Sequence, residues 1–184
     1  MLKNAKVKKE DIINVSFEIV KKEGFEGLNV KKVTKILNCS VQPIYYHIGS
    51  VENLKKEVWT KIYEKYNEYL SKDLDEDKPY RKLGVNYIKF AKEEPQLFKL
   101  MFMTHTSSSL LHDKNSYTDI LKYVENATGL DDKKAINYHK YMWIFTHGIA
   151  CMVATEISTI TEREIEEMLT HEFQALMSLE EGNK

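Results

Sequence analysis

Apolar residues recur at steps of three and four positions along almost the whole chain, which is the spacing of an amphipathic helix. No segment shows a convincing alternation of apolar and polar residues of the kind that predicts a strand. Only seven Gly and three Pro interrupt the 184 residues. The pattern therefore predicts an all-α fold.

Four helices are predicted in the first 70 residues, over residues 9–23, 30–37, 41–48 and 51–70. Gly24 follows the first of them and can adopt the left-handed conformation that ends a helix. Asn29, Ser40 and Ser50 each precede one of the other three, where a side-chain oxygen can accept a hydrogen bond from a free backbone N–H. These residues place helix boundaries at the breaks in the apolar pattern.

The connection between the second and third predicted helices is short. It consists of Asn38, Cys39 and Ser40, and Asn tolerates the left-handed backbone that a tight turn needs. In the second helix the residues predicted to face inward are Val33, Ile36 and Leu37. A helix, a tight turn and a short helix in this order are typical of a helix-turn-helix unit.

Five more helices are predicted in the second half of the chain. They run from Pro79 to the Glu94-Pro95 step, from Pro95 to Met103, from Asn115 to Ala127, from Asp131 or Asp132 to about Ile157, and from a capping box at Thr161 and Glu164 to about Leu179. The polar stretch from Thr104 to Ser109 is predicted to be the loosest part of the chain. We predict two domains, 1–50 and 51–184, with the helix over 51–70 as the link.

The charge of the chain is unevenly distributed. The formal net charge is −1, yet residues 1–50 hold nine Lys against five acidic residues, which leaves the remainder acidic by five. A basic head on an acidic body fits a partner that carries phosphates and binds at one end only. A chance excess of Lys on a solvated face is the alternative, and composition alone leaves it open.

The two cysteines and the N-terminus bear on the compartment. Cys39 and Cys151 are far apart in apolar surroundings, so we interpret them as small hydrophobic residues and not as a disulfide. The first residues lack the apolar core of a signal peptide, and no apolar run approaches the about 18 residues of a membrane span. We expect a soluble, cytoplasmic protein without contact to a membrane.

The stretch from Asn38 to Leu54 reads NCSVQPIYYHIGSVENL, with Tyr-Tyr-His two residues before Gly-Ser. This segment resembles the recognition segment of the TetR family of transcriptional regulators. The resemblance implies an N-terminal three-helix DNA-binding domain joined by a long helix to an α-helical regulatory and dimerisation domain. Three positions depart from the family pattern: Asn38 stands for the usual Gly, Ile48 for Phe, and Val51 for a phosphate-binding Lys.

A helix that enters the major groove contacts bases with its N-terminal residues. We therefore expect Val41, Gln42 and Pro43 at base edges, with the amide of Gln42 paired to adenine and the other two against thymine methyl groups. The phosphate-facing set is predicted to be Tyr45, Tyr46, His47 and Lys55, with the helix starts at Asn29 and Ser40.

Two alternatives concern these residues. The two tyrosines and His47 could instead form a packed cluster that holds the third helix against the first two. The N-terminal lysines could reach toward the minor groove or form only a solvated tail; they are Lys3, Lys6, Lys8 and Lys9.

A weaker resemblance lies further along the chain. Trp143, His147 and Gly148 match a Trp-x-x-x-His-Gly pattern found in one branch of TetR-type regulatory domains, and Phe90 begins a matching segment, FAKEEP. This resemblance implies a cavity for a small-molecule effector that acts as inducer, with no cofactor and no metal. The residues predicted to bind it are Phe90, Phe98, Met101, Phe102, Tyr123, Met142, Trp143 and His147.

A homodimer on a palindromic operator is expected, because one short recognition helix contacts few bases. Two copies related by a two-fold axis contact half-sites about 34 Å apart. The last two predicted helices are the most apolar pair in the chain, and small residues such as Gly148 permit a close approach. The predicted interface residues are Ile149, Met152, Val153, Ile157, Ile165, Met168, Leu169, Phe173 and Leu176; the alternative is that they fill only the chain's own core.

Some residues also suggest functions other than repression. His147 and Cys151 lie four residues apart on one helix and could suggest a metal site or a nucleophilic pair, but no third ligand has a matching spacing. The second half could bind a protein partner in place of a small ligand. The regulator could also activate transcription, since that depends on the position of the operator.

Overall fold

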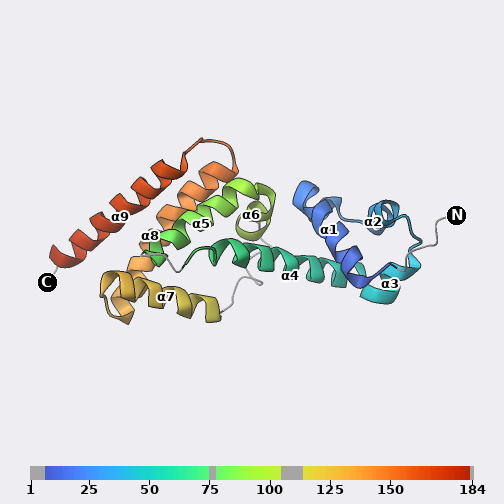
Figure 1. The fold of residues 1–184 in the computed structure, drawn as a ribbon, viewed down its shortest axis with the longest axis horizontal. Helices are drawn as coiled ribbons and strands as arrows, with labels where there is room; N and C mark the ends of the chain where they lie inside the picture. Colours follow the sequence, from blue (N-terminus) through green and yellow to red (C-terminus); the bar gives the residue numbers. More distant parts are fainter. Residues whose placement is uncertain (1–6, 75–77, 105–113, 183–184) are drawn as a thin grey trace. The chain divides into compact units, whose positions relative to one another are not determined.

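The computed structural model describes residues 7–74, 78–104 and 114–182, which consist of helices and the loops that connect them (Figure 1). No strand occurs in these three ranges, which confirms the predicted all-α fold. The chain divides into two compact units, Met1–Asn67 and Glu68–Lys184. The division lies inside one helix, α4, which runs over Val51–Leu70.

The first unit is a small bundle built on apolar helix faces. Its other elements are α1 (Lys9–Glu23), the 3₁₀ turn η1 (Phe25–Gly27), α2 (Val30–Leu37) and α3 (Gln42–Ile48). The bounds of all four helices agree with the predictions to within one residue. The core side chains include Ile12, Phe17, Val20, Val33, Ile44, Leu54 and Val58.

The turn between α2 and α3 is positioned by two asparagines. Asn29 caps α2 as predicted, since its side chain accepts a hydrogen bond from the Lys32 backbone N–H at 2.9 Å. Asn38 adopts the predicted left-handed conformation, with φ 49° and ψ 50°. The two residues together fix where α2 begins and where the chain turns toward α3.

Two predictions about this region were wrong. Ser40 does not cap α3, because Val41 occupies the N-cap position and its carbonyl accepts the first backbone bonds, from Ile44 and Tyr45. Ile36 does not face inward: α2 buries Val33, and Ile36 is 56% exposed.

Replacing Asn29 tests the first cap. Asn29→Ala should lower the free energy of unfolding of the first unit by about 1 kcal/mol, because the Lys32 N–H loses its acceptor. Urea unfolding of the Trp143→Phe background, followed by Trp59 fluorescence, reports on this unit alone, since the chain has two Trp. Asn29→Asp keeps an acceptor and should stay close to the parent; equal losses for Ala and Asp would contradict the cap.

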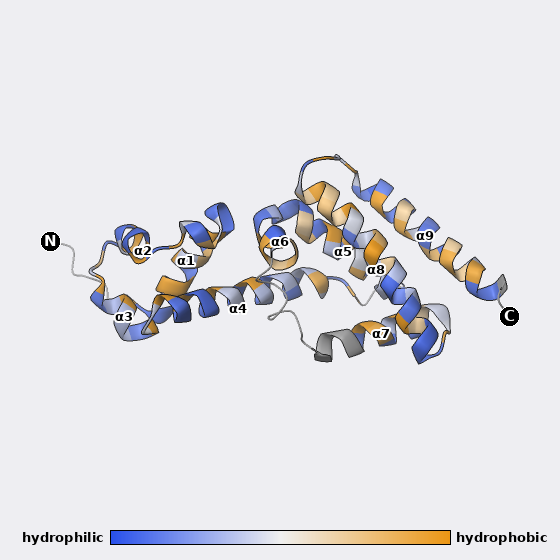
Figure 2. Cartoon of the chain, turned by 180° about the vertical axis from the view of Figure 1, so that it is seen from behind, coloured by the Kyte–Doolittle hydropathy of each residue, from blue (hydrophilic) through white to orange (hydrophobic). Residues whose placement is uncertain are grey.

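The second unit is built from the helices that follow α4. Its elements are α5 (Pro79–Glu93), α6 (Pro95–Phe102), α7 (Lys114–Thr128), α8 (Asp132–Ala154) and α9 (Glu162–Gly182). The most extensive packing joins α5 to α8, and α6, α7 and α9 also pack against α5 (Figure 2). The core includes Ile88, Phe90, Leu97, Phe98, Met101 and Val124.

The ends of the last two helices differ in how well the sequence predicts them. The capping box of α9 is confirmed: Glu164 accepts from the Thr161 backbone N–H at 2.8 Å, and the Thr161 hydroxyl accepts from the Glu164 N–H. The predicted end of α8 near Ile157 was wrong. The helix ends at Ala154, and Glu156 with φ 58° then turns the chain, which leaves Ile157 75% exposed.

Beyond Thr104, the stretch predicted to be the loosest part of the chain lies outside the described residues. In the described part, none of the helices combines the length and apolarity that a membrane span requires.

Candidate nucleic-acid interface

The short helix α3 is held by one face and presents the other to solvent. Ile44 and Ile48, one turn apart, are buried, and α3 packs against α1. On the opposite side Val41 is 49% and Tyr45 50% exposed, and Gln42 is exposed as well. The residues predicted to contact bases are therefore on the accessible side of the helix, except that Pro43 is half-buried.

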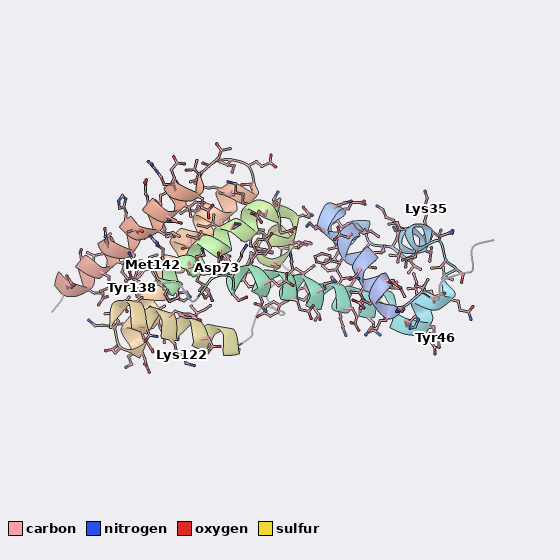
Figure 3. The ribbon with its side chains drawn as sticks, viewed as in Figure 1. Lys35, Tyr46, Asp73, Lys122, Tyr138 and Met142 are labelled. Atoms are coloured by element: carbon pink, nitrogen blue, oxygen red, sulfur yellow. The ribbon has the colours of Figure 1, made fainter. Side chains whose placement is uncertain are left out.

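Tyr46 is the most exposed aromatic residue of this face. Its side chain is 81% exposed and projects from α3 away from α1 and α2 (Figure 3). The alternative that both tyrosines form a packed cluster was therefore wrong for Tyr46. A phenol ring with this exposure can place its hydroxyl against a phosphate oxygen without disturbing the core.

His47 has a structural partner that the sequence did not predict. Its Nε2 lies 3.0 Å from the carbonyl oxygen of Val7, and because a carbonyl only accepts, the imidazole donates. The bond joins the start of the described chain to α3. The bond occupies the Nε2–H of His47, so this N–H holds Val7 beside α3 instead of donating to a phosphate.

The corner between α3 and α4 is fixed by Ser50 and Asn53. The Ser50 hydroxyl accepts from the Asn53 backbone N–H at 3.1 Å, which confirms the predicted cap of α4. The Asn53 side-chain amide in turn donates to the Ile48 carbonyl at 3.1 Å, a group left without a helical partner at the end of α3. Asn53 was missed in the sequence, although a polar residue three positions after a cap is a usable signal.

The lysines of the first unit differ in their surroundings. Lys9 pairs with Glu57, and Lys32 pairs with Glu23. Lys55, predicted to contact phosphate, is exposed in the first turns of α4, and Lys35 is exposed at the end of α2. Lys3 and Lys6 lie outside the described residues.

In the second unit an aromatic cluster surrounds His147. The Tyr87 hydroxyl lies 2.8 Å from His147 Nδ1. The Trp143 ring stacks on the imidazole, with centroids 4.9 Å apart and planes at 13°. Phe98 and Phe102 add further ring contacts with the same imidazole. Four residues predicted to bind an effector are thus brought together, namely Phe98, Phe102, Trp143 and His147, and Tyr87 was missed.

The other predicted effector residues are placed less favourably. Phe90 and Met101 are completely buried, and Met142 is nearly so. Tyr123, on α7, is half-buried. Trp143, which is 44% exposed, is the most accessible member of the set.

Cys151 completes the surroundings of His147 but lacks the character of a nucleophile. Its Sγ lies 3.4 Å from His147 Nε2. Burial raises the pKa of the thiol and lowers the pKa of the imidazole, so both groups are held neutral. A catalytic pair needs a thiolate, which this environment disfavours. No group of three metal-ligating side chains lies together among the residues that the structure describes.

The residues predicted for a dimer interface are buried, half-buried or exposed in the single chain. Ile149, Val153, Ile165 and Leu169 are buried in the chain's own core, which favours the alternative for these four. Met152 and Ile157 are exposed, and the half-buried residues are Met168, Phe173 and Leu176.

A different face of α8 carries exposed apolar residues. Tyr141, Ile144, Gly148 and Met152 follow one another at steps of three or four, and each is exposed. We call these four residues the α8 stripe. A Cβ added at Gly148 would meet no atom within 4 Å, so the space above the helix is open in the single chain. Tyr141 and Ile144 were missed because their apolar neighbours on the buried face gave the stronger pattern.

Comparison with known proteins gives relatives at low identity. No protein-family model matches the sequence. A curated relative, an uncharacterized HTH-type transcriptional regulator of Haemophilus influenzae, is 26% identical over 92 residues, which are 48% of this chain and 49% of that protein. The match thus spans about half the length of the relative.

Solved structures match over nearly the whole chain. A TetR-like transcriptional regulator from Rhodococcus sp. RHA1 superposes with a TM-score of 0.67 at 12% identity, covering 98% of each chain. The chain has the TetR fold. A TetR-family protein from Vibrio parahaemolyticus, described as a putative transcriptional regulator, gives a TM-score of 0.65 at 14% identity over 90% of this chain and 96% of that one. At these identities the TetR comparison fixes the architecture, and the roles of single residues rest on their geometry.

Proposed function

We propose that this protein is a TetR-type transcriptional regulator that binds a palindromic DNA operator as a homodimer. The observation that carries the proposal is the exposed face of α3, on which Val41, Gln42, Tyr45 and Tyr46 all face solvent. A helix presented in this way fits the major groove, which is wide enough to admit it. Lysines concentrated in the first 50 residues supply attraction to phosphates.

Dimerisation is proposed through the α8 stripe. An exposed run of Tyr141, Ile144 and Met152 around an uncovered glycine is an apolar surface that a second copy can cover. The symmetric pairing of two such helices is isologous, so each residue is used twice. The exposed Ile157 and the half-buried Met168, Phe173 and Leu176 stay predicted as the surrounding contacts.

Repression that is released by a small effector is the second part of the proposal. The aromatic rings around His147 offer stacking surfaces for a planar or apolar molecule, and Trp143 is the accessible one. An effector must bind the released form more tightly than the DNA-bound form in order to act. A protein partner on the second unit is the competing function; it predicts DNA binding that no small molecule changes.

Salt titration of DNA binding tests the proposal. The full-length protein should bind a fluorescent mixed-sequence duplex at low salt, and the logarithm of the association constant should fall linearly with the logarithm of the KCl concentration. The slope reports how many phosphate contacts are made. Absence of binding at low salt, or binding without salt dependence, would contradict DNA binding through this surface.

Tyr45→Phe removes one hydroxyl at the edge of the α3 face. If this hydroxyl contacts a phosphate, the variant should bind every DNA sequence several-fold more weakly while the order of preference among sequences stays unchanged. Fluorescence anisotropy on an operator selected from random duplex DNA and on a scrambled duplex checks this, with Tyr123→Phe in the second unit as control. A loss confined to the operator would instead show that Tyr45 contacts bases.

A further inference from the structure

The exposed face of α3 carries neither lysine, arginine nor an acidic side chain. No Lys or Arg occurs between Lys35 and Lys55, and no Asp or Glu occurs between Glu26 and Glu52. The chain has two Arg, at 81 and 163, so the first unit has none. The exposed side chains that Val41 and α3 can offer to base edges are therefore one amide, two phenols and one aliphatic group.

These groups match one base pair better than the other. In the major groove guanine presents two acceptors, N7 and O6, which a forked or multiple donor such as Arg or Lys satisfies, and cytosine presents a donor, which Asp or Glu accepts. Adenine presents an acceptor beside a donor, the complement of a Gln amide. Thymine presents a methyl group, which suits apolar contact. The α3 surface lacks the charged side chains that recognise a G·C pair, whereas Gln42 and Val41 match an A·T pair.

The positions of Val41 and Gln42 agree with this role in recognising bases. Val41 is at the N-cap position and Gln42 is the first residue of α3, so both lie at the end of the helix that enters a groove. Both are exposed, and the tyrosines follow one turn later. Ile44 and Ile48 anchor the opposite face, which fixes the rotation of the helix and directs Gln42 outward.

We propose, on the basis of the function proposed above, that the base pairs under the first turn of α3 are A·T in each half-site. Gln42 makes paired hydrogen bonds to an adenine, and Val41 packs on the methyl group of a thymine. Specificity against G·C arises because a guanine or cytosine there would leave the Gln42 amide with one mismatched group in the interface. The operator is thus selected by an uncharged surface, while the surrounding lysines supply affinity without sequence preference.

Selection of bound sequences from random duplex DNA tests this, with the full-length wild type, Gln42→Ala and Gln42→Arg under the same salt. The wild type should enrich a palindrome with invariant A·T pairs at the contacted positions. Gln42→Ala should lose the preference at one position in each half-site, with the affinity ratio between A·T and G·C falling by about 5- to 100-fold. Gln42→Arg should convert that same position to a preference for guanine.

The outcomes separate the inference from the function on which it rests. If the wild type enriches G·C at the position that Gln42→Ala relaxes, or if Gln42→Ala leaves the selected site unchanged, the inference is overturned and DNA binding stands. If no sequence is enriched and no duplex is bound at low salt, the proposed function fails with it. Matching circular dichroism spectra for the three proteins show that the folds are comparable, as expected at an exposed position.

Discussion

Gly148→Gln is expected to convert the proposed dimer into monomers and to abolish tight operator binding. In the single chain the substitution is harmless, because a Cβ at Gly148 meets no atom within 4 Å and Gln is a better helix former than Gly. In the proposed dimer, where a second α8 packs on the stripe, the same side chain would overfill the contact. Overpacking an interface costs about 1–3 kcal/mol, and two-fold symmetry introduces the clash twice, so the dimer dissociation constant should rise by about 30-fold or more.

Sedimentation equilibrium measures the effect on assembly, and anisotropy on the operator measures the effect on DNA binding. Gly148→Ala is the matched control, since a methyl group is small enough for close helix approach and should leave the dimer intact. Unfolding midpoints of both variants, taken at concentrations where all proteins are monomeric, should not fall below the wild type. A fully dimeric Gly148→Gln variant would show that the α8 stripe is not the interface.

Phe98→Ala should destabilise the second unit by about 3–5 kcal/mol, the range typical of truncating a buried Phe. Phe98 is completely buried and its ring contacts Tyr87, Phe90 and Phe102, so truncation leaves a cavity among rigid rings. Phe102→Ala, at a half-buried site of the same cluster, should cost clearly less.

Trp143 gives a local measurement of this loss. Its ring stacks on His147, which also contacts Phe98, so fluorescence in a Trp59→Phe background follows unfolding of the second unit. Denaturant titration should place the midpoint of Phe98→Ala well below that of Phe102→Ala. Equal midpoints would mean that the cluster is not a packed core around Phe98.

Local signals explain why most of the fold could be predicted from the sequence. Gly24, Asn29 and Ser50 each mark a helix end through their own backbone or side-chain chemistry, and the structure has the helices end or begin there. Ser40 carried the same signal and misled, because α3 begins one residue later, with Val41 as its N-cap and the Val41 carbonyl as the first backbone acceptor. A cap residue therefore predicts a boundary only to within a residue.

Contacts between distant residues explain what could not be predicted. The bond from His47 to the Val7 carbonyl joins positions 40 residues apart, and no periodic pattern records it. The apolar pattern of α8 likewise does not say which side the chain covers by itself. Ile149 and Val153 face the core, whereas Ile144 and Met152 remain exposed, and this difference follows from how α5, α6, α7 and α9 pack against α8.

The most direct test of DNA binding through α3 is to map where this helix lies on bound DNA. A cleavage reagent attached to Tyr46→Cys, in a background with Cys39→Ser and Cys151→Ala, should cut the selected operator at two symmetric major-groove positions, separated by about one helical turn or a multiple of it. The same reagent at Lys122→Cys, in the second unit, serves as control. A single cleavage position, a pattern identical to that of the control, or no cleavage of a bound duplex would contradict the placement of α3 in the groove.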